Sequence, residues 1–172
     1  NVLRGGSGDD VISGLGGDAK VFGGVGNDSL DAGAGNDLID GSDPALVDQV
    51  YRDADKVSYL SASGPVDIDL ASGTASGEGN DTLVHIENAS GSLFDDTIVG
   101  DDQANDLAGD VGNDTIDGAA GNDNVVGGPG NDRLDGGSGT DTASYKSSPA
   151  AVNVDLAAGT ASGQGSDALA GF

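Results

Sequence analysis

Hydrophobic positions are sparse along this chain and recur at every ninth residue in two stretches. Each stretch repeats the frame Gly-Gly-x-Gly-x-Asp-x-apolar-x, in which the eighth position is consistently apolar. The last three residues of the frame predict a short strand whose middle side chain points inward, as the period-2 pleat requires. Each unit therefore buries one side chain, and several units must stack before any of them is stable.

The frame runs through two segments that are copies of one another. The first run opens at Gly5 and fades after Gly41, and the second opens at Gly91. A shift of 86 residues aligns Gly5 with Gly91 and Asp28 with Asp114. Because the chain is 172 residues long, twice this shift, the sequence indicates an internal duplication.

The stretch between the runs has a different pattern and is also repeated. Apolar residues alternate with Asp at 66–70, which favours a strand with one buried face. We expect a small β cap that covers the end of one run and joins it to the next, as terminal units of repeat arrays must. Its predicted buried face consists of Val66, Ile68, Leu70, Leu83 and Ile86.

These patterns divide the chain into four parts. Residues 1–54 form the first run with an irregular turn at 41–54, and residues 55–90 form the cap or linker. Residues 91–140 form the second run, and residues 141–172 form a second, truncated cap. Residues 41–49 fit a loop or a helical turn capped by Ser42 or Asp43. Because the chain starts and stops at equivalent points of the duplication, we expect it to be a segment of a longer parent polypeptide.

The composition fits a module that needs cations. Thirty acidic residues against six basic ones give a formal charge of −24, and there are 32 Gly, three Tyr, three Phe and no Trp. Such a chain lies close to the disordered class until its charges are neutralised. Nucleic acid is excluded as a partner because the chain lacks a basic footprint. No segment has the ~20 apolar residues of a transmembrane helix, and the absence of Cys removes disulfides.

The repeated frame carries the chemistry of a calcium-binding turn. Its glycines lack a Cβ, so the backbone can adopt positive φ and direct carbonyl oxygens toward a common point, and the Asp adds a hard anionic oxygen. A single Gly-Asn-Asp triplet could equally form an Asx turn. The nine-residue recurrence, as in Gly112-Asn113-Asp114 and Gly121-Asn122-Asp123, favours calcium.

These turns resemble those of the repeats-in-toxin (RTX) family of calcium-binding nonapeptide repeats. The intervening units, with Asp55 to Tyr59 and Ile86-Glu87-Asn88, resemble the linkers between RTX blocks of adenylate cyclase toxin and related secreted proteins. The resemblance implies an all-β fold, a parallel β-roll in two copies, each followed by a small β cap or linker. It also implies several Ca²⁺ ions per chain, bound between turns eighteen residues apart.

The resemblance implies which residues bind calcium. The earlier turn contributes the carbonyls of positions two and four and its Asp, and the later turn contributes the carbonyls of positions one and three and its Asp. In copy two the implied ligands are Asp110, Gly112 and Asp114 with Gly127, Pro129 and Asp132; Ala119, Gly121 and Asp123 with Gly136, Ser138 and Asp141; and Ser92, Phe94 and Asp96 with Gly109, Val111 and Asp114. In copy one they are Gly6, Gly8 and Asp10 with Gly23, Val25 and Asp28.

Other pairings depart from the pattern. Asn105, paired with Asp123 through the turn opening at Gly118, keeps an oxygen but loses a charge, so we expect weaker binding there. Asp37 faces Ala19, which has no ligand atom in its side chain. Leu46 stands where the irregular turn should have an Asp. We therefore expect copy two to bind more calcium than copy one.

Several residues outside the frame admit a functional and a plain structural interpretation. We expect His85 at an exposed strand position rather than in a catalytic or metal role, and Tyr59 and Tyr145 as packing residues of the cap. Asp43-Pro44 is expected to be a simple turn rather than a labile bond. For Glu78 and Asp81 we favour surface solvation over a calcium site in the cap.

Two classes of function fit the sequence. The first is a calcium-responsive module of a secreted bacterial protein, exported by the type I route, disordered without calcium and folded outside the cell to promote folding of its parent. The second is an adhesive module that binds carbohydrate or a surface, for which an exposed aromatic or basic strip is missing. An enzyme is disfavoured because one His and no Cys assemble no HExxH helix or catalytic triad. We expect a monomer.

Overall fold

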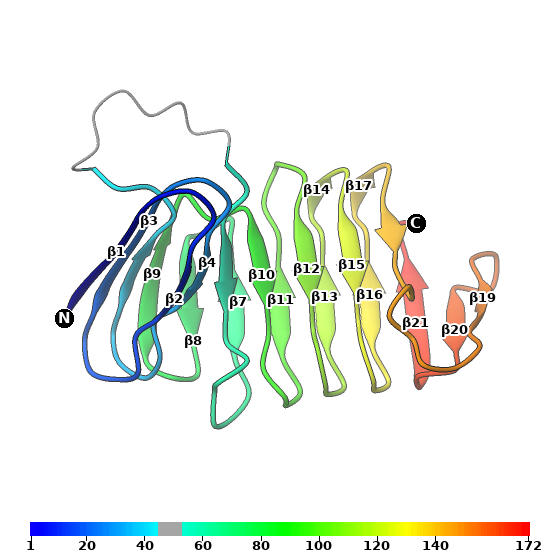
Figure 1. The fold of residues 1–172 in the computed structure, drawn as a ribbon. Helices are drawn as coiled ribbons and strands as arrows, with labels where there is room; N and C mark the ends of the chain where they lie inside the picture. The colour runs from blue at the N-terminus through cyan, green and yellow to red at the C-terminus, as the bar shows by residue number, and fades with distance from the viewer. Residues whose placement is uncertain (45–52) are drawn as a thin grey trace.

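The computed structural model describes residues 1–44 and 53–172, and over these residues every regular element is a strand (Figure 1). The expected all-β, parallel architecture is confirmed. A twelve-stranded sheet has the order β1 (Val2–Ser7), β3 (Lys20–Val25), β5 (Leu38–Asp40), β9 (Asn80–Val84), β8 (Thr74–Ser76), β7 (Asp67–Asp69), β11 (Thr97–Val99), β13 (Thr115–Asp117), β16 (Arg133–Asp135), β21 (Ser166–Ala170), β20 (Thr160–Ser162) and β19 (Asn153–Asp155). Within the same described ranges there is no helix that could span a membrane.

A seven-stranded sheet faces the first across the thin interior of the roll. Successive units of the chain alternate between the two sheets, as the parallel stacking of short arrows in Figure 1 shows. Its order is β18 (Thr142–Ala143), β15 (Asn124–Val126), β12 (Asp106–Ala108), β10 (Asn88–Ser90), β6 (Lys56–Ser58), β4 (Ser29–Asp31) and β2 (Val11–Ser13). A two-stranded sheet pairs β14 (Ala120–Gly121) with β17 (Ser138–Gly139) along one row of turns.

The register between stacked units follows the nine-residue frame. Two successive frames complete one coil, so Ile98 of β11 pairs with Ile116 of β13, which pairs with Leu134 of β16. On the other sheet Leu107 pairs with Val125 in the same way. The expected offset of eighteen residues between stacked turns is therefore confirmed in both runs, because β2 and β4 of copy one also pair at this offset.

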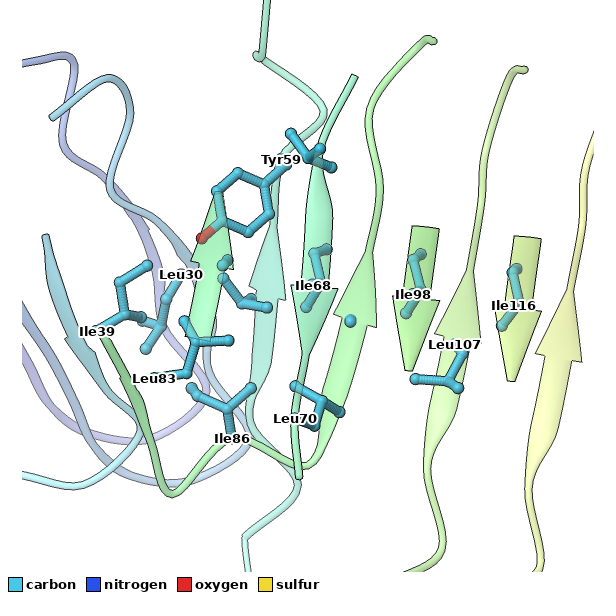
Figure 2. Close-up of a cluster of buried hydrophobic side chains, with 14 of the residues drawn as sticks. Leu30, Ile39, Tyr59, Ile68, Leu70, Leu83, Ile86, Ile98, Leu107 and Ile116 are labelled. Atoms are coloured by element: carbon cyan, nitrogen blue, oxygen red, sulfur yellow. The ribbon is translucent and has the colours of Figure 1, made fainter. Parts of the chain in front are cut away.

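The core is a double row of the eighth-position side chains. Leu30, Ile39, Ile98, Leu107 and Ile116 are each at most 1% exposed, and they line up along the interior in Figure 2. Since each coil contributes only two large apolar side chains, the buried apolar area per residue is small. The core by itself is therefore a modest source of stability.

The linker is built into both sheets. β6 lies between β4 and β10 in the seven-stranded sheet, and the antiparallel strands β7, β8 and β9 lie between β5 and β11 in the other. β9 pairs in parallel with β5 of copy one, and β7 pairs in parallel with β11 of copy two. Both sheets thus continue from one copy to the next. The predicted buried face is confirmed, with exposures between 1% and 8% for Val66, Ile68, Leu70, Leu83 and Ile86.

The second linker repeats this arrangement at the end of the roll. β20 pairs antiparallel with β21 and β19 pairs antiparallel with β20, and these two strands project beyond the stack in Figure 1. Val154 and Leu156, the counterparts of Ile68 and Leu70, are 44% and 56% exposed, because no further strand covers them within the chain. These equivalent apolar positions are therefore buried in the first linker and exposed in the second.

Near the first linker, the expected position of His85 needs correction, and the expectation for Leu46 lies outside the described residues. His85 is exposed as expected, but it lies in the turn between β9 and β10 with φ of 51°, not in a strand. Its Nδ1 is 2.9 Å from Asp40 Oδ1, which holds the ring against the turn. In the irregular turn, Arg4 pairs with Asp43, whereas 45–52, and with it Leu46, falls outside the described part of the chain.

Candidate metal centre

The aspartates of the frame form two ladders along the two rows of turns. In each ladder a backbone N–H of one turn, in most cases that of an acidic residue, donates a hydrogen bond to the carboxylate of the next stacked turn. The series is interrupted before Asp96, whose donor is Val66 N–H, and between Glu87 and Asn105, where Asn105 Nδ2 donates to Glu87 O. One ladder precedes the strands of the twelve-stranded sheet, and we call it the A ladder; the B ladder precedes the seven-stranded sheet. The A ladder contains Asp37, Asp81, Asp96, Asp114, Asp132 and Asp167, and the B ladder contains Asp10, Asp28, Asp55, Glu87, Asn105, Asp123 and Asp141.

The middle of the A ladder shows its geometry most clearly. Asp96 N–H donates to Asp114 Oδ1 at 2.9 Å, and Asp114 N–H donates to Asp132 Oδ1 at 3.0 Å. These three side chains are between 1% and 3% exposed. The turns thus place negatively charged groups one above another inside the structure, where solvent cannot screen them.

Most ladder aspartates use only one carboxylate oxygen in this bond. The second oxygen is buried and has no hydrogen-bond partner in Asp10, Asp28, Asp37, Asp114, Asp123, Asp132 and Asp141. A buried carboxylate oxygen without a partner is costly, and a bound cation removes that cost. The donor set of hard oxygens suits Ca²⁺, so the residues fit the metal that the sequence predicts.

Burial also perturbs the acidity of the ladder. Desolvation by burial, together with the neighbouring carboxylates, raises the pKa of Asp114 to about 7 and that of Asp132 to about 6, although ladder hydrogen bonds oppose the rise. The pKa of Asp55 is raised to about 7 by the same causes. Without a cation these groups therefore bind protons at a higher pH than an exposed Asp does.

The structure brings most of the predicted ligand turns together. Asp10 N–H donates to Asp28 Oδ1 at 2.8 Å, and Asp123 N–H donates to Asp141 Oδ1 at 2.9 Å. Backbone atoms of the same turns also meet in Gly8 N–H to Val25 O at 2.6 Å, Gly112 N–H to Pro129 O at 3.2 Å and Ser138 N–H to Ala119 O at 3.0 Å. Asp110 and Ala119 hold positive φ of 71° and 68°, the conformation that glycine holds at this position elsewhere.

In two of the predicted pairings, the side chain expected to bind calcium has protein hydrogen-bond partners on its oxygen atoms. Asp96 accepts from Ser92 N–H and Ser92 Oγ as well as from Val66 N–H, so neither of its oxygens is left unpaired. Asn105 Oδ1 accepts from Asp101 N–H, and its Nδ2 donates to Glu87 O. Ser92 and the amide of Asn105 thus supply protein partners at points where the regular turns leave an oxygen free.

Four ladder residues, Asp55, Asp81, Glu87 and Asp167, were missed by the sequence reasoning. Asp55, Asp81 and Asp167 are acceptors for Asp28, Asp37 and Asp132, respectively. The expectation of surface solvation for Asp81 is wrong, since it is 4% exposed. A signal existed for Asp55, because Asp55 to Tyr59 matches Asp141 to Tyr145 and Asp141 was assigned as a ligand. The signal for Asp81 was the triplet Gly79-Asn80-Asp81.

The tyrosines of the two linkers take part in the A ladder. Tyr59 Oη donates to Asp81 Oδ2 and Tyr145 Oη donates to Asp167 Oδ2, both at 2.7 Å. Tyr59 is also packed in the core, as expected, at 2% exposed. A phenol thus occupies the oxygen that the regular turns leave unpaired, and this second role was not predicted.

No cluster of three or more His, Cys, Asp or Glu side chains suited to a metal occurs in residues 1–44 and 53–172. A cation between two stacked turns would therefore draw most of its oxygens from backbone carbonyls. The model of the RTX calcium-binding nonapeptide repeat matches the chain in four copies, at residues 1–18, 16–43, 86–116 and 109–143, which together exceed half of its length. None of the curated proteins compared matches the chain. The chain belongs to the RTX calcium-binding nonapeptide-repeat family, and its cofactor is calcium.

Proposed function

We propose that this chain is a calcium-responsive folding module of a secreted bacterial protein, disordered without calcium and folded by extracellular calcium so that it promotes folding and secretion of its parent. The observation that supports it most directly is the row of buried, unpaired aspartate oxygens. Such oxygens destabilise the compact chain unless a cation binds them, and this makes folding conditional on the metal.

The proposed ligands follow the stacked turns. The strongest site takes the carbonyls of Asp110 and Gly112 with the Asp114 carboxylate from one turn, and the carbonyls of Gly127 and Pro129 with the Asp132 carboxylate from the next. Bound calcium supplies the positive charge that two buried carboxylates need. In the folded state the glycine-rich turns hold their carbonyls in place, and the ladder hydrogen bonds orient the carboxylates.

The chain's charge makes the response cooperative. A formal charge of −24 opposes compaction, and each coil buries only two large apolar side chains. Each neutralised pair of turns also provides a strand edge on which the next turn can stack. Folding of one coil therefore assists calcium binding by its neighbour.

The proposal predicts that the chain is largely unfolded in excess chelator and gains β structure cooperatively at roughly millimolar calcium. Far-UV circular dichroism during a calcium titration measures this. Magnesium is the control, and it should substitute poorly because it prefers tight octahedral coordination and retains its waters. A fully folded spectrum in excess chelator would contradict the proposal.

A further inference from the structure

The turn between β8 and β9 repeats the calcium-turn frame inside the linker. Ser76-Gly77-Glu78-Gly79-Asn80-Asp81 is followed by Thr82-Leu83-Val84, so only the first position departs from the frame. This turn lies between the family matches that end at residue 43 and begin at residue 86. It is also entered from an antiparallel strand, unlike the turns of the two runs.

This linker turn stacks on the turn at residues 32–37, although it follows 44 residues later instead of eighteen. Three hydrogen bonds join the two turns: Gly35 N–H to Glu78 O at 2.9 Å, Asn80 N–H to Asn36 Oδ1 at 3.0 Å and Asp37 N–H to Asp81 Oδ1 at 3.0 Å. A methyl group at Gly79 would overlap the carbonyl oxygen of Gly35, so the two backbones are in direct contact.

The same contacts join the two turns of the strongest proposed calcium site. They are Gly112 N–H to Pro129 O at 3.2 Å, Asn131 N–H to Asn113 Oδ1 at 3.0 Å and Asp114 N–H to Asp132 Oδ1 at 3.0 Å. A methyl group at Gly130 would likewise overlap the Gly112 carbonyl oxygen. The linker turn therefore makes the same three hydrogen bonds to its stacked neighbour as a regular turn does.

An unpaired buried oxygen lies at this junction. Asp37 is 3% exposed, and its Oδ1 accepts from Ala19 N–H at 2.7 Å while its Oδ2 has no partner. Glu78 Oε2 is also buried and unpaired. Ala19, on the other side of Asp37, offers no side-chain ligand. Of the two turns stacked on residues 32–37, only the linker turn therefore offers a cation a second ladder carboxylate, that of Asp81.

We propose a calcium site between the turns at 32–37 and 76–81, formed by the Asp37 and Asp81 carboxylates and the carbonyl oxygens of both turns. This site rests on the proposed calcium-dependent function and extends it to the linker. It ties copy one to the linker through a metal ion. The Tyr59 hydroxyl, bound to Asp81, lies beside it.

Terbium, which binds at calcium sites, provides a local readout because a nearby phenol sensitises its emission. The chain has three Tyr and no Trp, so Tyr51→Phe with Tyr145→Phe leaves Tyr59 as the single sensitiser. In this variant we expect tyrosine-excited terbium emission that calcium competes away. Adding Asp37→Asn should abolish most of this emission, whereas adding Asp132→Asn, which alters a site in copy two, should leave it.

Calorimetric counting of bound calcium gives a second measurement. Asp37→Asn should lower the number of ions per chain by one, and Asp67→Asn should not, because Asp67 is an exposed acidic residue of the same linker outside both ladders. If the Asp37→Asn variant does not fold, the terbium emission of the chain with Tyr59 as its single tyrosine still tests the linker site. Calcium binding without sensitised emission overturns the linker site alone, and absence of calcium binding in the unsubstituted chain overturns the proposed function itself.

Discussion

At the scale of single residues, the molecule is organised by buried carboxylates that each serve two neighbours. Asp114 accepts the backbone N–H of Asp96 and donates its own N–H to Asp132, so it belongs to two junctions of the A ladder. Asp10 lies at the start of the B ladder and makes one such contact, with Asp28. Position in the ladder thus determines how many of the proposed calcium sites include one side chain.

We expect Asp114→Ala to weaken calcium binding at two adjacent junctions and Asp10→Ala to weaken it at one. Each lost carboxylate leaves a turn with too few hard oxygens to hold the ion. Calorimetric stoichiometry on both variants measures the difference, with Asp67→Ala as an exposed control. Equal losses for the two ladder variants would contradict the proposed ligand sets.

The raised pKa values predict that protons substitute in part for calcium. Since the folded-state pKa of Asp114 is about 7, above its ordinary value of 3.8, the metal-free fold is stabilised by protonation at low pH and loses this contribution as pH rises through about 7. In excess chelator, β structure should therefore increase between about pH 7 and pH 5, and the calcium midpoint should rise. Circular dichroism at each pH measures both.

The control for this pH dependence is Asp114→Asn combined with Asp132→Asn, which removes two of the groups with raised pKa. This variant should show a smaller gain of structure on acidification. An unchanged pH dependence would mean that the loss of overall charge, and not protonation of the ladder, drives the change.

At the scale of elements, each linker stacks in the same way as the repeats, with a tyrosine hydroxyl bound to one ladder Asp. Tyr59 and Tyr145 supply a hydroxyl to Asp81 and Asp167 where the repeats leave an oxygen unpaired. The apolar face of the first linker continues the core row through Ile68, which pairs with Ile98 of the second run. The first linker therefore stacks on both copies, through its apolar core residues and through its ladder hydrogen bonds.

Ile68→Asp should raise the calcium concentration needed for folding without removing a ligand. Ile68 is 1% exposed, and a charge at this position costs roughly 3 kcal/mol or more. Thr82→Asp, on the exposed side of β9, is the control with the same added charge. Circular dichroism titrations compare the midpoints. Equal midpoints for Ile68→Asp and the unsubstituted chain would mean that the linker is only a tether.

At the scale of the whole molecule, the fold was predictable wherever the nine-residue period holds. The frame fixes strand length, the buried eighth position and the eighteen-residue stacking, because each follows from local backbone preferences. The period does not show which strand lies beside β5 once the run fades. That neighbour is β9, more than 40 residues later, and the pairing is set by a turn whose frame begins with Ser76 instead of Gly.

The ladder residues illustrate the same limit. Asp55 follows an irregular turn, so counting nine residues from Asp37 reaches Leu46 instead. In the structure Asp55 accepts Asp28 N–H at 2.8 Å and therefore replaces the expected position. Which carboxylate accepts the N–H of a turn depends on stacking between distant residues, and the nine-residue period does not predict that stacking.

The ladders also give the stack a direction. In every ladder bond described above, the donor N–H belongs to the earlier turn and the accepting carboxylate to a later one, from Asp10 with Asp28 to Asp132 with Asp167. The donor N–H of a ladder turn is therefore paired by a residue that follows it in the chain. If folding starts at the C-terminal end, each added turn finds the carboxylate that accepts its N–H already in place. If folding starts at the N-terminal end, the N–H of the last added turn has no carboxylate acceptor until the next turn folds.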